Sequence, residues 1–331
     1  MHFLLVNHYL GSGGYYPIGG GSEIPLLLIP AIERAGGRVM VRAPVKEIVM
    51  DESGQRAVGV AVQKGDKKII IHAPLVISNA GMNNTCRLLP QSVAVKHSLK
   101  KSLQEVGTSV SCVQVFVGLK GTAEELELPK GQNIWLWKNS DIAKVEDVFK
   151  EMNTNFDNFP LSFISFPSTK DPEWDSRYPG KTTCLAISCG NFNWFTDWDG
   201  TVTNKRGKDY EALKKDIGRV LWNDVVQMYP QLEDKVEYFD VATPLSYQYY
   251  LGGQFGEIYG LNHSVSRFDP EVLATLRPET PIAGLYLTGQ DVATCGLVGG
   301  MLGGVLCTSA ILKRNVLMDM MELRKKMKKA S

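Results

Sequence analysis

Glycine clusters mark two places where the main chain could approach a phosphate group or a planar ring closely. The stretch from Gly11 to Gly21 holds six glycines in eleven positions. It fails the G-x-G-x-x-G test for a dinucleotide loop, because the third glycine would fall on Tyr16 in one register and on Ile24 in the other. If the protein binds a dinucleotide, its usual first phosphate loop is therefore not among these 331 residues.

The second cluster follows the segment GLYLTGQD, which predicts a buried strand that ends in a polar turn. From Val292 to Leu312 there are 21 residues without a charge, five of them glycines. A strand, a glycine-rich turn and a helix of small residues form the arrangement that a cofactor needs when it lies against a helix N-terminus. A transmembrane helix with a G-x-x-x-G face is the rival interpretation, and the diluting glycines disfavour it.

Several other kinds of chemistry lack a motif. The sequence has no G-x-S-x-G elbow, no H-E-x-x-H and no P-loop, so hydrolase, zinc-protease and NTPase functions have no anchor. The six cysteines form no C-x-x-C and no Cys/His pairs, which argues against structural zinc and a disulfide scaffold. A net charge of +1 gives no bulk attraction for nucleic acid. We expect neither a metal nor a nucleic-acid partner.

We expect a compact α/β unit over residues 22–81, between the two glycine clusters. Ser22 can cap a helix that has Pro25 in its first turn and stops at Gly36 and Gly37. Strand-forming runs follow at 38–50, bent at Pro44, at 56–63 and at 67–81, with turns between them. The unit is expected to run from a helix through a small meander to a buried strand.

Residues 86–275 have a different texture. Alternating runs at 109–119, 161–167 and 182–189 predict a separate, largely antiparallel sheet. Aromatic-rich loops are expected between these runs, and they include Trp135, Trp137, Trp174, Trp194, Phe195 and Trp198. A helix is expected over 209–228, because the following apolar residues share one face: Leu213, Ile217, Val220, Leu221 and Val225.

Two long segments together resemble the flavin-dependent amine oxidase and phytoene desaturase superfamily. They are YYPIGGGSEIPLLLIPAIERAGGRVMVRAPVKEI near the start and GLYLTGQDVATCGLVGGMLGGVLCTSAIL near the end. Shorter matches, such as SNAG and SFPSTKDPEW, extend the resemblance over essentially the whole chain and favour the retinoid-reducing members. In this superfamily the first segment occurs after the first third of the protein, so we expect the chain to be a C-terminal portion or a shortened form.

The resemblance implies a mixed α/β (α+β) fold with two lobes. One is a partial, Rossmann-like FAD-binding lobe, and the other is a substrate lobe built on a largely antiparallel sheet. The expected boundaries are 1–85 for the first part of the FAD lobe, 86–275 for the substrate lobe, 276–315 for the segment that closes the FAD lobe, and 316–331 for a basic tail.

The resemblance also implies which residues meet the cofactor. The main chain at Val45 would meet the adenine ring of FAD, and Gln290 or Asp291 would bond its ribityl or pyrophosphate part. Gly299–Leu302 is expected to form the first turn of the closing helix, with its N–H groups toward the flavin. A core valine, a glycine-rich helix packed on a sheet and a plain turn remain open alternatives. The full expected set is Gly19, Gly20, Gly21, Val45, Gly289, Gln290, Asp291, Gly299, Gly300, Met301 and Leu302.

The implied activity is saturation of one double bond of a retinoid by a reduced flavin, with NAD(P)H as an electron source. No catalytic acid is assigned, and the candidates by residue type alone are Tyr15, Tyr16, Tyr247, Tyr249, Tyr250 and His263. Carotenoid desaturation or isomerisation is one alternative, and a non-catalytic lipid-binding or partner module is another. Because the G-x-G-x-x-G loop is lacking, we expect the 331 residues alone to hold FAD weakly or not at all and not to reduce the retinoid.

The last residues form a basic tail. From Lys313 onward there are seven Lys and Arg residues against Asp319 and Glu322, and apolar residues recur at helical spacing. We expect an amphipathic helix that docks on an anionic membrane surface, with a solvated helix as the alternative. The resemblance implies a peripheral location at the endoplasmic reticulum membrane.

Overall fold

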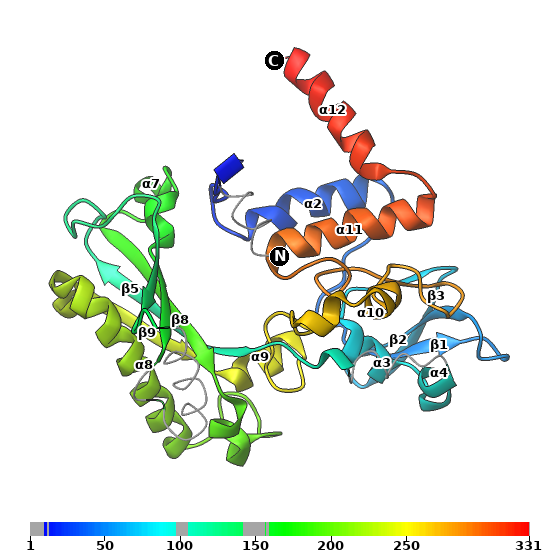
Figure 1. Cartoon of the computed structure of the whole chain (residues 1–331), viewed down its shortest axis with the longest axis horizontal. Helices are drawn as coiled ribbons and strands as arrows, with labels where there is room; N and C mark the ends of the chain where they lie inside the picture. Colours follow the sequence, from blue (N-terminus) through cyan, green and yellow to red (C-terminus); the bar gives the residue numbers. More distant parts are fainter. Residues whose placement is uncertain (1–9, 12, 97–104, 142–155, 157–158, 331) are drawn as a thin grey trace. The chain divides into compact units, whose positions relative to one another are not determined.

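The computed structural model describes residues 10–11, 13–96, 105–141, 156 and 159–330, and it divides the chain into two compact units (Figure 1). The first unit is Met1–Val39 with Cys112–Thr243, and the second unit is Met40–Ser111 with Pro244–Ser331. Both units combine helices and strands, so the expected mixed α/β class is confirmed.

The units divide the chain at other residues than the expected lobes. Residues 1–39 group with the central sheet and not with residues 40–85, and residues 244–275 group with the closing segment. A hydrogen bond from the Gly19 N–H to the Asp171 carboxylate, 2.9 Å, is one contact that ties the early segment to the central sheet. The cofactor and substrate roles given to the lobes stay predictions.

The first unit is built on a five-stranded sheet in the order β6-β7-β8-β5-β9. The pairs β6–β7, β7–β8 and β5–β9 are antiparallel, as expected for this part of the chain. Its strands are β5 (Ser111–Lys120), β6 (Asn133–Trp137), β7 (Leu161–Ser165), β8 (Lys181–Gly190) and β9 (Val236–Ala242). Its helices are α2 (Glu23–Arg34), η1 (Pro167–Lys170), α7 (Trp174–Arg177), η2 (Phe192–Trp198), α8 (Lys208–Met228) and η3 (Pro230–Lys235).

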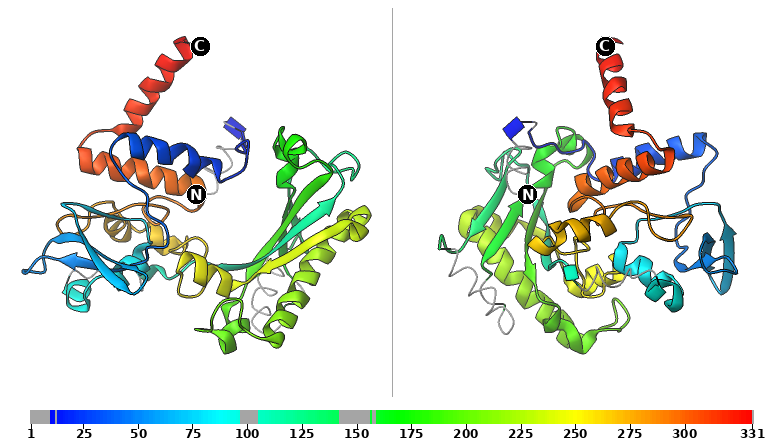
Figure 2. Two further views of the ribbon diagram at one scale, coloured as in Figure 1. Left: turned by 180° about the vertical axis from the view of Figure 1, so that it is seen from behind. Right: turned by 45° about the vertical axis from the view of Figure 1, so that its right-hand side comes forward.

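Helix α8 runs along one face of this sheet (Figures 1 and 2). Gly218 allows the close approach, since a Cβ there would lie 2.5 Å from a methyl group of Val241 on β9. The Ser162 hydroxyl on β7 donates to the buried Asp224 carboxylate on α8, 2.6 Å. Alternate residues of the strands therefore form a core with α8, as the period of two in the sequence predicted.

The second unit contains two small sheets. One is the antiparallel meander of β1 (Val45–Met50), β2 (Ala57–Lys64) and β3 (Lys67–His72). The other is a parallel pair of β4 (Val76–Ser78) and β10 (Leu285–Leu287). The helices are α3 (Met82–Leu88), α4 (Gln91–Lys96), α9 (Pro244–Leu251), η4 (Val265–Phe268), α10 (Pro270–Thr275), α11 (Gly296–Leu312) and α12 (Val316–Ala330).

Strand β10 joins the two clusters of the second unit's core. Leu285 packs with Ile48, Val76 and Ile282 in one cluster, and Leu287 packs with Met82 and other residues in the second cluster. Burying apolar side chains stabilises a fold by about 25 cal/mol per Å² of apolar surface. The strand is short, but it fixes where the residues after Leu287 lie.

Two local expectations were wrong. Trp135 and Trp137 lie on strand β6, where they alternate with Ile134 and Leu136, and not in a loop. Ser22 precedes α2, but its side chain makes no capping hydrogen bond, because its main chain is already helical (φ −67°, ψ −21°). The end of α2 is as predicted, since Gly36 takes a positive φ of 82°.

Candidate functional site

The parallel strands of the second unit end at a cavity. Val76 pairs with Leu285 and Ser78 with Leu287, and the Thr288 N–H donates to the Ser78 carbonyl, 3.0 Å. Carboxyl ends of parallel strands meet at one edge, where α/β proteins commonly bind ligands. The residues directly after β4 and after β10 therefore come together.

The cavity measures about 270 Å³ and lies within the second unit. Its polar wall holds four side-chain amides, from Asn79, Asn83, Asn84 and Gln290, and two carboxylates, from Glu257 and Asp291. The rest of the wall is Ala80, Gly81, Leu251, Gly253, Ile258, Gly260, Thr288, Gly296 and Gly300. Amides, carboxylates and glycine main chain suit a ligand that carries hydroxyl groups and ring nitrogens.

Asp291 holds three segments of the wall in place. Its Oδ2 accepts the Met82 N–H at the start of α3, 2.7 Å, and its Oδ1 accepts the Leu261 N–H, 2.9 Å. A Cβ on Gly260 would lie 2.2 Å from Oδ1, so only glycine fits beside this carboxylate. The buried carboxylate of Asp291 therefore fixes the main chain at Met82 and at Leu261, next to the cavity.

Gln290 connects the same turn to helix α11. Its amide donates to the Ile258 carbonyl, 3.2 Å, and its Oε1 accepts the Gly296 N–H, 3.1 Å. The side chain thereby satisfies one of the N–H groups that every helix leaves free at its start. Gln290 and Asp291, both predicted as cofactor contacts, line the cavity together.

Helix α11 begins three residues earlier than expected. Cys295 is extended and precedes Gly296, so of the expected residues only Gly299 lies in the first turn, and Gly300, Met301 and Leu302 follow it. Glycine spacing alone did not reveal the start, since Gly296, Gly299 and Gly300 can each open a helix. The expected first turn is therefore corrected to Gly296–Gly299.

The glycines of α11 have different surroundings. A Cβ on Gly303 would lie 2.2 Å from the Gly289 carbonyl oxygen, so the helix backbone lies directly on the turn after β10. A Cβ on Gly299 would lie 1.6 Å from the Thr294 carbonyl oxygen. A Cβ on Gly300 would meet nothing within 4 Å, and Gly300 lines the cavity. Gly300 thus faces open space, whereas the main chain of Gly299 packs against Thr294 and the main chain of Gly289 packs against Gly303.

Three further predicted residues lie in the second unit without lining this cavity. Val45 begins strand β1 and pairs with Val62. Met301 and Leu302 follow Gly300 on α11, and both side chains are exposed. Their cofactor roles stay predictions.

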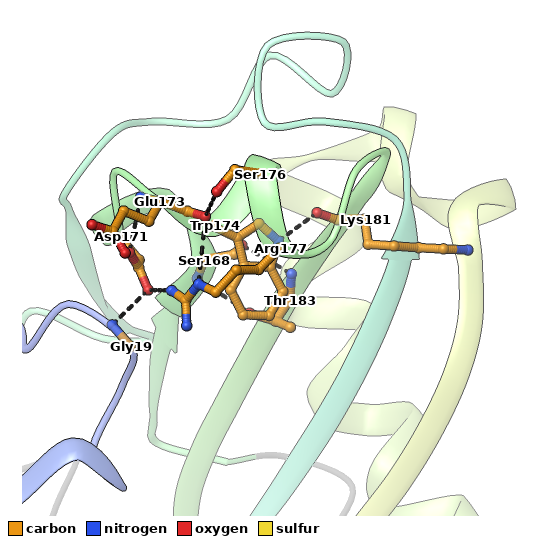
Figure 3. A network of polar contacts seen from close by, with 9 residues as sticks. All are labelled: Gly19, Ser168, Asp171, Glu173, Trp174, Ser176, Arg177, Lys181 and Thr183. Atoms are coloured by element: carbon orange, nitrogen blue, oxygen red, sulfur yellow. Dashed lines mark hydrogen bonds and ion pairs between the residues drawn. The ribbon is translucent and has the colours of Figure 1, made fainter.

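Gly19, Gly20 and Gly21 belong to the first unit, where a network of polar contacts holds their turn (Figure 3). The Asp171 carboxylate accepts the Gly19 N–H, the Glu173 N–H at 3.0 Å, and a hydrogen bond from the Arg177 guanidinium. Burial alone raises the pKa of Asp171, but these hydrogen bonds outweigh burial and hold the pKa below its usual range. Lys170 lies 5.7 Å from the centre of the Tyr16 ring.

The face of the central sheet opposite α8 carries aromatic and aliphatic side chains, which we name the open face. Trp135 on β6 contacts Phe163 on β7, with ring centres 4.9 Å apart. Lys170 donates to Ser165, 2.7 Å, and to Asn133 at the end of the two strands. The open face comprises Phe116, Trp135, Trp137, Leu161, Phe163, Leu185 and Ile187.

The candidate proton donors are divided between the units: Tyr15 and Tyr16 belong to the first, and Tyr247, Tyr249, Tyr250 and His263 belong to the second. Tyr249 and Tyr250 are exposed. His263 lies near Arg267, and burial and this cation lower its pKa. Its Nε2 is buried without a hydrogen-bond partner among the residues that the structure describes. No catalytic acid is assigned.

Sequence reasoning missed several residues of the cavity wall. Asn79 and Gly81 follow β4 directly, so the rule that ligands bind at the carboxyl ends of parallel strands would have found them. Glu257 and Gly260 come nearly 180 residues later, and no local pattern links them to Asn79. Only the fold brings these two segments together.

Within the described residues, no group of three or more His, Cys, Asp or Glu side chains could hold a metal ion. No single described helix is long and apolar enough to cross a membrane. Only the bent pair Gly296–Leu312 and Val316–Lys329, at 111° to each other, meets the criteria of length and composition.

A family model and a solved structure indicate the class of protein to which the chain is similar. The family model described as GMC oxidoreductase matches residues 22–113. The crystal structure of an oxidoreductase from Methanosarcina mazei has the same fold, with a TM-score of 0.57 and 18% identity, over 95% of this chain and 59% of that chain. The chain therefore has the mixed α/β fold of an oxidoreductase, as the motifs predicted.

The relatives in sequence are more specific. The chain is 44% identical to all-trans-retinol 13,14-reductase of Rattus norvegicus, over 99% of this chain and 54% of that protein. It is 34% identical to a protein of Danio rerio named inactive all-trans-retinol 13,14-reductase, again over 99% of this chain and 54% of that one. It is 28% identical to the phytoene desaturase of Phycomyces blakesleeanus, over 77% of this chain and 40% of that protein.

These matches confirm the resemblance that the glycine-rich segments indicated. Over almost all of its residues the chain is similar to all-trans-retinol 13,14-reductases, with phytoene desaturase as a more distant relative. The chain spans about half the length of the curated relatives it matches.

Proposed function

We propose that this chain carries the flavin-contacting and substrate-contacting parts of an oxidoreductase that saturates the 13,14 double bond of all-trans-retinol to all-trans-13,14-dihydroretinol. The observation that carries the proposal is the cavity at the carboxyl ends of β4 and β10, in a chain 44% identical to the rat reductase.

The residues of the cavity fit one portion of FAD. Ligand sites that enclose a whole small molecule measure about 300–1,000 Å³, and this cavity, at about 270 Å³, is slightly smaller. The open space at Gly300 and the amides of Asn79 and Gln290 suit the ribityl chain or the edge of the flavin ring. These residues would hold that portion through hydrogen bonds and close main-chain approach.

The open face of the first unit suits a polyene substrate. A retinoid is a long, flat, apolar molecule, and aromatic and branched aliphatic side chains bind such surfaces by hydrophobic contact and stacking. Trp135, Phe163 and Ile187 offer that surface. Lys170 at its edge offers a donor for a terminal hydroxyl group.

The chemistry that a bound, reduced flavin supplies is a hydride for one end of a double bond. The chain would orient the double bond, and its apolar side chains would keep water away. We infer NAD(P)H as the source of electrons, because a flavin that reduces its substrate must itself be reduced again in each turnover.

A non-catalytic role is the second candidate. It is favoured by the 34% identity to the Danio rerio protein whose name states that it is inactive. A protein of this kind could bind a retinoid on the open face without reducing it. The two roles differ in product formation and not in ligand binding.

The proposal can be tested with a chimera, in which this chain is joined to the part of the rat reductase that it does not match. We expect the chimera to hold FAD and to convert all-trans-retinol to its 13,14-dihydro product, measured by chromatography with the rat enzyme as the positive control. The 331 residues alone should hold FAD weakly. A chimera that binds FAD and retinol without forming dihydroretinol would establish the non-catalytic role. A chimera that converts a carotene and not retinol would refute the retinoid substrate.

We further propose that α12 docks on an anionic membrane surface, with the endoplasmic reticulum membrane as the location. Arg324, Lys325, Lys326, Lys328 and Lys329 cluster in its second half. Met318, Met320, Met321 and Leu323 are exposed on the same helix. Each basic residue near an anionic surface contributes about 1 kcal/mol. Removing residues 316–331 should reduce sedimentation with anionic vesicles, and equal sedimentation would refute docking.

A further inference from the structure

Arg267 is the largest of the fully buried side chains in the described part of the chain, with 1% of its surface exposed. Arginine is almost never fully buried unless its charge is paired or hydrogen-bonded. It lies on η4, outside the cavity wall, and no predicted site residue is on that helix. Such a costly residue needs a structural or functional reason.

The guanidinium binds the main chain of two segments that line the cavity. Its Nη2 donates to the Asp291 carbonyl, 2.8 Å, and to the Gln290 carbonyl, 3.2 Å. Its Nη1 donates to the Leu261 carbonyl, 3.3 Å. One rigid, planar group thus holds the turn after β10 and the end of the 258–261 segment together.

The same two segments are linked a second time through side chains. The Asp291 carboxylate accepts the Leu261 N–H, and the Gln290 amide donates to Ile258. Burial lowers the pKa of Arg267, and the Asp291 charge acts in the opposite direction. The Asp291 charge therefore offsets only part of the effect of burying the Arg267 cation, and the three carbonyl acceptors supply its hydrogen bonds.

We propose that Arg267 is a positioning residue that fixes Gln290 and Asp291 in the geometry needed to hold the flavin. The inference rests on the proposed function of the cavity. Arg267 acts through the main chain of these two residues and does not itself touch the ligand.

The test replaces Arg267 by lysine in the chimera with the rat reductase. A lysine ammonium on a flexible stem lacks the planar fork that reaches three carbonyls. Arg267→Lys should weaken FAD binding about tenfold, the effect of about one lost charge-assisted hydrogen bond. It should also speed amide exchange over residues 288–291 and shift the visible spectrum of the bound flavin.

Two controls separate positioning from general destabilisation. Arg277→Lys makes the same change on an exposed arginine that pairs with Glu279. Ile48→Ala destabilises the core of the same unit at a residue that does not line the cavity. Both should leave FAD affinity within about twofold, well below the tenfold step of about 1.4 kcal/mol.

Equal losses of FAD affinity in Arg267→Lys and Ile48→Ala would show that Arg267 is merely structural. Unchanged affinity in Arg267→Lys would also overturn the proposal. If Arg267→Lys does not fold, Arg267→Gln keeps a neutral planar donor that is too short to reach all three carbonyls, and an unchanged FAD affinity in that variant would overturn the proposal. Absence of FAD from the unsubstituted chimera would refute the proposed function, while amide exchange over 288–291 would still decide whether Arg267 fixes the turn.

Discussion

Replacing Gly303 by alanine should destabilise the second unit, because α11 lies directly on the turn after β10 at this residue. A Cβ on Gly303 would lie 2.2 Å from the Gly289 carbonyl oxygen and 2.7 Å from the Gly289 nitrogen. Both atoms belong to the main chain, so no flexible side chain can move aside. The helix and the turn must separate.

Gly304→Ala is the matched control, since a Cβ on Gly304 would meet nothing within 4 Å. Both substitutions gain up to about 1 kcal/mol of helix propensity, and only Gly303→Ala adds overpacking, which costs about 1–3 kcal/mol. The free energy of unfolding should therefore be lower for Gly303→Ala than for Gly304→Ala by roughly 1–3 kcal/mol.

Urea unfolding followed by circular dichroism measures this difference, provided that the two variants have the same dependence on urea concentration. Amide exchange over residues 288–291 should rise in Gly303→Ala alone. Equal unfolding midpoints for the two variants would refute the close packing of α11 on Gly289.

Two further predictions concern titratable groups. Burial raises the pKa of Cys112 and of Cys184 to about 12. At pH 8 both thiols should therefore react with iodoacetamide far more slowly than the half-buried Cys295, as measured by mass spectrometry. Equal labelling of the three cysteines would contradict this prediction. The free energy of unfolding should fall as the pH rises above about 8.5, because the thiols of the unfolded chain then ionise while the buried thiols stay protonated. Because the pKa of Asp171 is lowered in the fold, its stabilising effect is present above about pH 4 and lost as the pH falls. Asp171→Asn should therefore be less stable than the unsubstituted protein at pH 7, and the gap in urea midpoint should close at low pH. Asp51→Asn, at a half-buried carboxylate in a turn of the second unit, should leave the Gly19 turn unchanged. A gap in urea midpoint that is constant with pH would refute the role of Asp171.

Strands with strict alternation could be predicted from the sequence, and short or charged strands could not. The alternation in 109–119 and 182–189 predicted β5 and β8, because alternate residues of each strand are buried. Strand β6 has five residues and two exposed tryptophans, which suggested a loop. Strand β9 carries Glu237 and Asp240, so its sequence does not alternate regularly between apolar and polar residues. Its pairing with β5 places it in the sheet.

The candidate site was predictable only where neighbouring residues carry the pattern. The family resemblance of their glycine-rich segment implied Gln290, Asp291 and Gly300 as cofactor contacts, and these residues line the cavity. Glu257 was not, because its place beside Asn79 depends on how two distant segments fold together. The contact between Gly19 and Asp171 spans 152 residues, which no local pattern can show.

Two glycines of α11 can test directly whether the cavity at the ends of β4 and β10 holds part of the flavin, as we propose. Gly300 lines this cavity with open space beyond it, and Gly304 has open space one turn further along the same helix, away from the cavity. FAD titration of the chimera, followed by visible absorbance, compares Gly300→Leu with Gly304→Leu. We expect Gly300→Leu to weaken binding by about tenfold or more, or roughly 1.4 kcal/mol, and Gly304→Leu to bind FAD like the unsubstituted chimera. Equal affinities for the two variants would show that this cavity does not hold the flavin.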